Sequence, residues 1–125
     1  MKLRVRGDSL RLRVTQSEVA RLIDGAAVTE CTQIGPAQLR YSLQADAADN
    51  TPMNRPQIRF ETGAEGGEIK VVVAGEQLRA WGESAEVGIE ATVDSLALLI
   101  EKDFACLDPR DGAEDSDTFP NPKAT

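Results

Sequence analysis

Apolar and polar side chains alternate along the first fourteen residues of the chain. Every second position is apolar across residues 2–6 and again across residues 9–14, which is the pattern of strands with one buried face. Gly7-Asp8 separates the two runs, and a glycine at the first central position favours a two-residue type II′ turn. We therefore predict a tight hairpin that pairs Val5 with Leu10 and Leu3 with Leu12.

A short helix is predicted after this hairpin. Thr15 and Glu18 have the spacing of a capping box, in which each side chain binds the backbone N–H of the other residue. An apolar stripe follows, and Gly25 suits the position just after a helix end, so the helix should end near Asp24. Two further strands are predicted, at residues 28–34 and 38–45.

The second half of the chain repeats this pattern. Residues 9–34 align with residues 68–93 without a gap, and the flanking apolar runs also correspond, 3–6 with 58–61 and 39–43 with 96–100. The chain is thus predicted to be a duplicated ββαββ unit with pseudo-twofold symmetry. The expected fold is α+β: about eight mostly antiparallel strands and two short helices, forming a barrel or two packed sheets. The expected equivalent pairs are Val14 with Val73, Leu22 with Trp81, and Val28 with Val87.

The chain is predicted to form one domain followed by a tail. The domain spans residues 1–106, with repeat 1 at about 2–45, a polar linker at 46–56 and repeat 2 at about 57–103. Residues 107–125 contain five acids and three prolines and too few apolar residues for a core, so we expect an irregular acidic tail. Phe119 is the exception, and we expect it to anchor the tail in an apolar notch, with tail acids near the basic hairpin.

Composition narrows the class of protein. The two cysteines, Cys31 and Cys106, are too few for a disulfide framework, and we expect both to be free and buried. The chain lacks an apolar leader and a long apolar run, so we expect a cytoplasmic protein that does not enter a membrane. A net charge of −7 argues against nucleic acid as the main partner.

The two ends of the chain carry a family resemblance. The opening KLRVRGDSLRLRVTQSEV and the close EKDFACLDPRDGAEDSDTFPNP resemble those of a family of small bacterial proteins of unknown function. The resemblance covers nearly the whole chain and implies a bacterial protein with a single domain. It implies no activity and no site residues.

Basic residues on the polar face of the hairpin give the clearest functional signal. In the predicted register Arg4 faces Arg11 and Lys2 faces Arg13, and like charges opposite each other in a sheet cost up to about 1 kcal/mol per pair. An anionic small molecule or an acidic protein segment would relieve this repulsion. The repeat adds further cations at equivalent positions, so both halves are expected to share one basic surface. The predicted anion-binding residues are Lys2, Arg4, Arg6, Arg11, Arg13, Arg40, Arg59 and Lys70.

The alternative interpretation of these residues is an ordinary solvated face, balanced by Glu61, Glu68 and Glu101. Gly63-Ala-Glu-Gly-Gly67 lacks the Gly-Lys-Ser/Thr ending of a phosphate loop and is predicted to be a hairpin turn.

Three functions are consistent with the sequence. The first is a non-enzymatic binding or regulatory module that needs no cofactor and uses the basic face. The second is a phosphate-ester enzyme that resembles the triphosphate tunnel proteins, although their Glu-x-Glu-x-Lys opening is replaced here by the all-basic Lys2-Leu-Arg-Val-Arg6. The third is a metal-binding protein that uses Cys106, Asp115 and Asp117, without any histidine. No catalytic residue is predicted.

Overall fold

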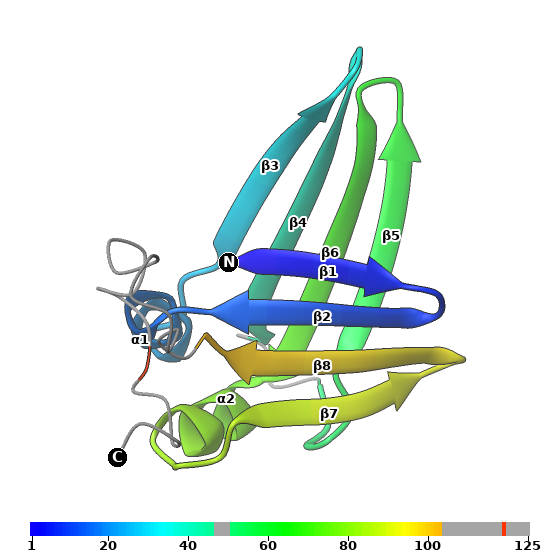
Figure 1. Ribbon diagram of the computed structural model, residues 1–125. Helices are drawn as coiled ribbons and strands as arrows, with labels where there is room; N and C mark the ends of the chain where they lie inside the picture. The colour runs from blue at the N-terminus through cyan, green and yellow to red at the C-terminus, as the bar shows by residue number, and fades with distance from the viewer. Residues whose placement is uncertain (47–50, 104–118, 120–125) are drawn as a thin grey trace, which may run out of the picture.

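The chain folds as two copies of a ββαββ unit, as the repeat predicts. The computed structural model describes residues 1–46, 51–103 and 119 (Figure 1). In chain order the first copy contains β1 (Lys2–Arg6), β2 (Ser9–Val14), α1 (Gln16–Ile23), β3 (Val28–Ile34) and β4 (Ala37–Asp46). The second contains β5 (Gln57–Gly63), β6 (Gly66–Ala74), α2 (Gly75–Gly82), β7 (Gly88–Val93) and β8 (Leu96–Lys102).

Each of the two sheets takes one hairpin from each repeat. One sheet has the order β1-β2-β8-β7 and the other has the order β3-β4-β6-β5. The hairpins are antiparallel, and the two joins between repeats, β2 with β8 and β4 with β6, are parallel. The two sheets cross one over the other, with both helices gathered at one end (Figure 1). The architecture is therefore two open, packed sheets and not a closed barrel.

The first hairpin has the predicted register. Val5 pairs with Leu10 and Leu3 pairs with Leu12. Gly7 has a φ of +53°, and Asp8 is not among the non-glycine residues with positive φ, as a type II′ turn requires. The turn from Gly63 to Gly67 also joins two strands, as predicted.

The helix boundaries follow from local chemistry. Both hydrogen bonds of the predicted capping box are present, with the Thr15 N–H donating to the Glu18 carboxylate at 2.9 Å. The helix ends at Ile23, and Gly25 adopts a φ of +93° just beyond it. The second helix starts at Gly75 without a side-chain cap, because Ala74 has no hydroxyl.

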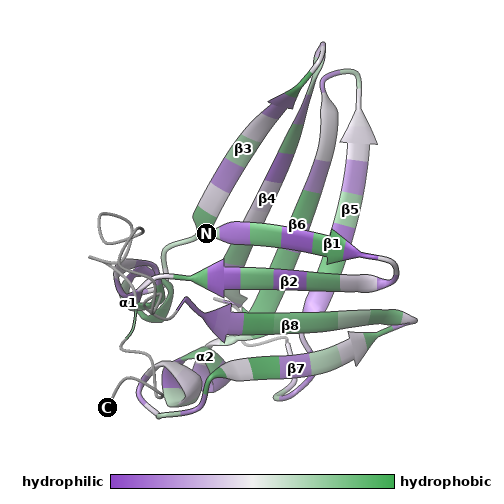
Figure 2. Cartoon of the chain, viewed as in Figure 1, coloured by the Kyte–Doolittle hydropathy of each residue, from purple (hydrophilic) through white to green (hydrophobic). Residues whose placement is uncertain are grey.

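The core lies between the inner faces of the two sheets and the helices. Val14 and Val73 are fully buried, and Leu22 and Trp81 occupy the same place on the two helices. Apolar residues alternate with polar ones along β1 and β2 in Figure 2, so only one face of each of these strands enters the core.

One predicted equivalence is wrong. Val28 is 1% exposed whereas Val87 is 44% exposed, so Val87 does not take its place. Val28 pairs with Leu43, and the matching pair in the second repeat is Ile89 with Ile100. The loop between α2 and β7 is longer than the loop between α1 and β3, which shifts the alignment at this point.

Candidate functional site

Strand alternation separates the predicted basic residues onto two outer faces. The outward side chains of β1 and β2 form what we call the hairpin face: Lys2, Arg4, Arg6, Arg11 and Arg13. Arg40, Arg59 and Lys70 lie on the outer face of the other sheet. Because the inner faces of both sheets meet in one core, these outer faces point away from each other. The expected single basic surface is therefore not formed.

The hairpin face has the predicted repulsive register. Arg4 lies opposite Arg11, and Lys2 lies opposite Arg13. Glu101, on the neighbouring strand β8, compensates two of these charges, with its Oε1 at 2.5 Å from Arg13 Nε and 3.6 Å from Arg11 Nε. At the end of the same strand, Asp103 Oδ2 lies 3.4 Å from Lys2 Nζ.

Arg4 and Arg6 differ from the other cations of this face. Both are exposed, and neither forms an ion pair with any residue that the structure describes. Five cations thus meet two carboxylates on the hairpin face. Neither helix covers it, since both lie at the end of the sheet (Figure 1). Counted over the residues that the structure describes, the face carries a surplus of positive charge.

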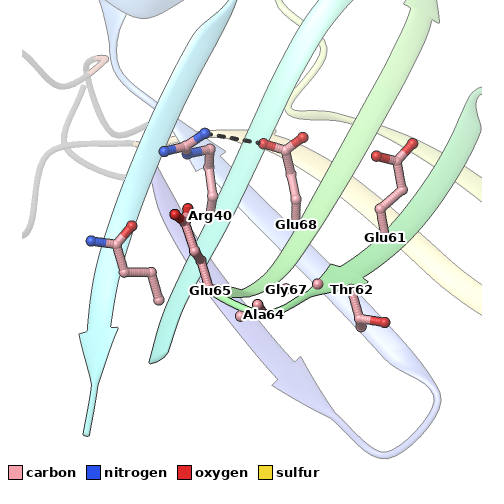
Figure 3. Close-up of a pocket in the computed structure, with 10 residues that line it drawn as sticks. Arg40, Glu61, Thr62, Ala64, Glu65, Gly67 and Glu68 are labelled. Carbon is pink, nitrogen blue, oxygen red and sulfur yellow. Dashed lines mark ion pairs between the residues drawn. The ribbon is translucent and has the colours of Figure 1, made fainter. Parts of the chain in front are cut away.

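On the outer face of the other sheet, one carboxylate compensates Arg40 and Lys70, whereas Arg59 forms no ion pair with a described residue. Glu68 lies 3.2 Å from Lys70 and 3.7 Å from Arg40, measured between the charged oxygen and nitrogen atoms. A shallow cavity of about 470 Å³ opens beside this cluster at the β5–β6 turn, lined also by Glu61 and Glu65. Figure 3 shows Arg40 turned toward Glu68 within this acidic surrounding. An anion would meet three carboxylates here, so this cavity does not suit one.

The predicted metal site cannot be located. Cys106, Asp115 and Asp117 lie outside the described residues, as do the tail acids that we expected near the hairpin. Within residues 1–46 and 51–103 no group of three or more His, Cys, Asp or Glu side chains is arranged to hold a metal ion. Cys31 is exposed on β3, so the expectation that it is buried is wrong.

A second cluster was not predicted. The Lys102 side chain points inward, is 5% exposed, and donates to the Ser84 carbonyl at 2.6 Å. Its Nζ lies 5.6 Å from the centre of the Trp81 ring and 5.4 Å from that of Phe119. Burial lowers the pKa of Lys102, and the charge of Glu86 opposes part of that shift.

Phe119 lies at this cluster. Its ring packs against the core, and its N–H donates to the Asp103 carbonyl at 2.8 Å. The predicted docking of Phe119 is therefore confirmed. The sequence of β8 could have indicated that Lys102 points inward, because the apolar residues Leu96, Leu98 and Ile100 lie on the same side of the strand.

The two open sheets argue against the alternative of a triphosphate tunnel enzyme. A tunnel of the triphosphate tunnel type requires a closed barrel, whereas each sheet here ends in two edge strands. In the described part of the chain neither helix has the length and apolar character needed to cross a bilayer.

Comparison with known proteins places the chain in a family. The sequence profile of a family of unknown function matches residues 1–123. No curated protein and no solved structure matches the chain.

Proposed function

Because the chain belongs to DUF7009, a family of unknown function, we propose its function from the geometry of the hairpin face. The protein is a non-enzymatic binding module whose hairpin face holds an acidic protein partner. The observation that carries this proposal is the pairing of cation with cation across β1 and β2, together with the absence of an ion pair at Arg4 and Arg6 among the described residues.

The physical reason is the cost of leaving like charges adjacent. Glu101 already contacts Arg11 and Arg13, so the remaining surplus is concentrated along β1, at the edge of the sheet. A row of carboxylates beside the solvent-exposed edge of β1 would form ion pairs with the exposed guanidinium groups of this strand. The face is a strand surface and not a cavity, which favours an extended acidic segment over a small enclosed anion.

The repeat supplies a matched control for the test. Arg4 and Arg59 occupy equivalent positions on edge strands, both are exposed, and they lie on opposite outer faces. We would measure binding of a fluorescein-labelled polyglutamate peptide by anisotropy for the parent protein and for Arg4→Glu and Arg59→Glu. Arg4→Glu should weaken binding by about three- to tenfold, because each exposed ion pair contributes up to about 1 kcal/mol and reversal adds repulsion.

Arg59→Glu should leave the affinity within about twofold of the parent value, because its face is already rich in carboxylates. Binding should also weaken as salt is raised, since the contacts are exposed. Equal losses in both variants would contradict the proposal, because they would reflect net charge alone. Binding of inorganic phosphate in preference to polyglutamate would replace the protein partner with a small anion.

A further inference from the structure

The edge of β1 presents free backbone groups. In a two-residue hairpin the residues flanking the turn form a hydrogen-bonded pair, here Arg6 and Ser9, and the pairs alternate from there. The N–H and C=O groups of Leu3 and Val5 therefore point away from β2. Among the described residues no other strand lies on that side, and no backbone hydrogen bond reaches these two residues from it.

The other sheet packs behind this one and carries exposed apolar residues toward its hairpin tips. The strands β3 to β6 extend past β1 at their hairpin tips (Figure 1). Their inward positions change from buried near the helices to exposed at the tips, from Val28 at 1% to Ile34 at 58% exposed. Phe60 is 65% exposed on the same inner face, and Leu39 is half-buried. We call Ile34, Leu39 and Phe60 the shelf.

Val5 completes this arrangement from the front sheet. It lies on the inner side of β1, is 61% exposed, and faces the space between the sheets. Three features thus occur together: backbone groups on β1 that have no partner among the described residues, exposed apolar residues at the tips of the sheet behind it, and the exposed Arg4 and Arg6 in front.

We propose that the acidic partner binds as an extended strand that pairs with the free edge of β1. Such a strand would become the fifth strand of the front sheet. Its outward side chains would lie beside Lys2, Arg4 and Arg6 and should be acidic, whereas its inward side chains would cover Val5 and the shelf and should be apolar. The proposal rests on the proposed function and specifies the partner as a segment with alternating acidic and apolar residues.

Charge and composition favour this partner over two other segments that could pair with β1: the β1 strand of a second copy and the acidic stretch of the same chain. A second copy pairing through its own β1 would place arginine rows side by side, which is repulsive. The acidic stretch 107–118 has leucine and alanine as its only apolar residues, apart from one proline, so it cannot supply an alternating apolar face. A separate segment of alternating character meets both requirements.

The test compares peptides that differ only in order. An alternating Glu-Val peptide should bind more tightly than a block peptide of the same composition, and a Lys-Val peptide should not bind. In the complex, amide hydrogen exchange followed by NMR should slow at Leu3 and Val5, whose N–H groups have no partner among the described residues.

Two variants separate this inference from the proposed function. Val5→Pro removes an outward N–H without breaking the pairing with β2, and Val5→Thr is its control because the N–H remains. Val5→Pro should bind the alternating peptide about tenfold more weakly than Val5→Thr does. Phe60→Ser, on the shelf, should weaken binding of the alternating peptide and leave binding of polyglutamate unchanged.

The outcomes are distinct. If Arg4→Glu weakens binding while Val5→Pro and Phe60→Ser do not, the hairpin face binds acidic chains without strand pairing. The inference of an added strand is then wrong, while the proposed function still holds. Equal affinity for the alternating and block peptides also overturns it. If the parent protein sediments as a dimer without peptide and Val5→Pro as a monomer, the strand belongs to a second copy and the partner proposed here is wrong.

Discussion

Glu18 and Gln77 occupy the same position, the third residue of their helices, and each holds the segment that leads into the first strand of its repeat. Both side chains are buried despite their polarity. The Glu18 carboxylate binds the amino group of Met1, just before β1. Gln77 accepts from the Asn54 N–H at 3.0 Å and donates to the Asn54 side-chain oxygen at 3.1 Å, just before β5. The duplication thus preserved an anchoring contact while its chemistry changed.

Loss of the Gln77 anchor should destabilise the protein. We expect Gln77→Ala to lower the free energy of unfolding by about 0.5–1.5 kcal/mol, because it removes two hydrogen bonds between the buried Gln77 side chain and the exposed Asn54. The measurement is a urea denaturation curve, with Gln16→Ala, at an exposed position of the other helix, as the control. A Gln77→Ala midpoint equal to that of the control would show that the anchor contributes nothing.

Two glycines of the β5–β6 turn should respond differently to alanine. Gly66 has a φ of +136°, and a Cβ there would collide with the Gln38 carbonyl oxygen, whereas a Cβ at Gly63 would meet no atom within 4 Å. We expect Gly66→Ala to lower the free energy of unfolding by at least about 1–3 kcal/mol and Gly63→Ala to change it little. Similar urea midpoints for the two variants would contradict this assignment.

Removal of the Phe119 ring should release the tail and admit water to the cluster that contains Lys102 and Trp81. Trp81 is the only tryptophan, so its fluorescence reports on this cluster directly. In Phe119→Ala we expect a red-shifted emission maximum and faster limited proteolysis after residue 103, with Phe119→Leu intermediate. If spectrum and cleavage rate match those of the parent protein, Phe119 does not hold the tail.

Lys102 should make stability depend on alkaline pH. Burial holds the pKa of Lys102 in the folded state below its usual 10.5, so the unfolded state binds this proton more tightly. Stability should therefore rise as pH increases from the folded pKa toward 10.5. Relative to Lys102→Met, the parent protein should gain stability in urea denaturation as pH rises through the alkaline range that ends at 10.5. A constant difference between the two proteins across that range would refute the assignment.

Local features of this fold could be predicted because short segments determine them. The Gly7-Asp8 turn, the capping box at Thr15 and the helix end at Gly25 each depend on a few neighbouring residues. The ungapped alignment correctly identified the repeat up to the second helix. It failed at Val28, because a longer loop in repeat 2 leaves no trace in an alignment based on apolar positions.

The grouping of the hairpins could not be predicted from the same signals. Alternation within β4 is identical whether this strand joins the first hairpin or the other sheet, so the sequence did not place Arg40 on the opposite face. Pairing of β2 with β8 joins distant parts of the chain, and no local propensity encodes it. The hairpin face itself was predictable because both of its strands belong to one hairpin.

The sharing of each sheet by both repeats gives the linker before β5 a thermodynamic role. A ββαββ unit alone would have two hairpins with no neighbours, and it would need a second unit to complete both sheets. Two separate units would assemble only as far as their concentration allowed. Joining them end to end replaces that dependence with an effective concentration on the order of millimolar, so the fused chain completes its sheets however dilute the protein is.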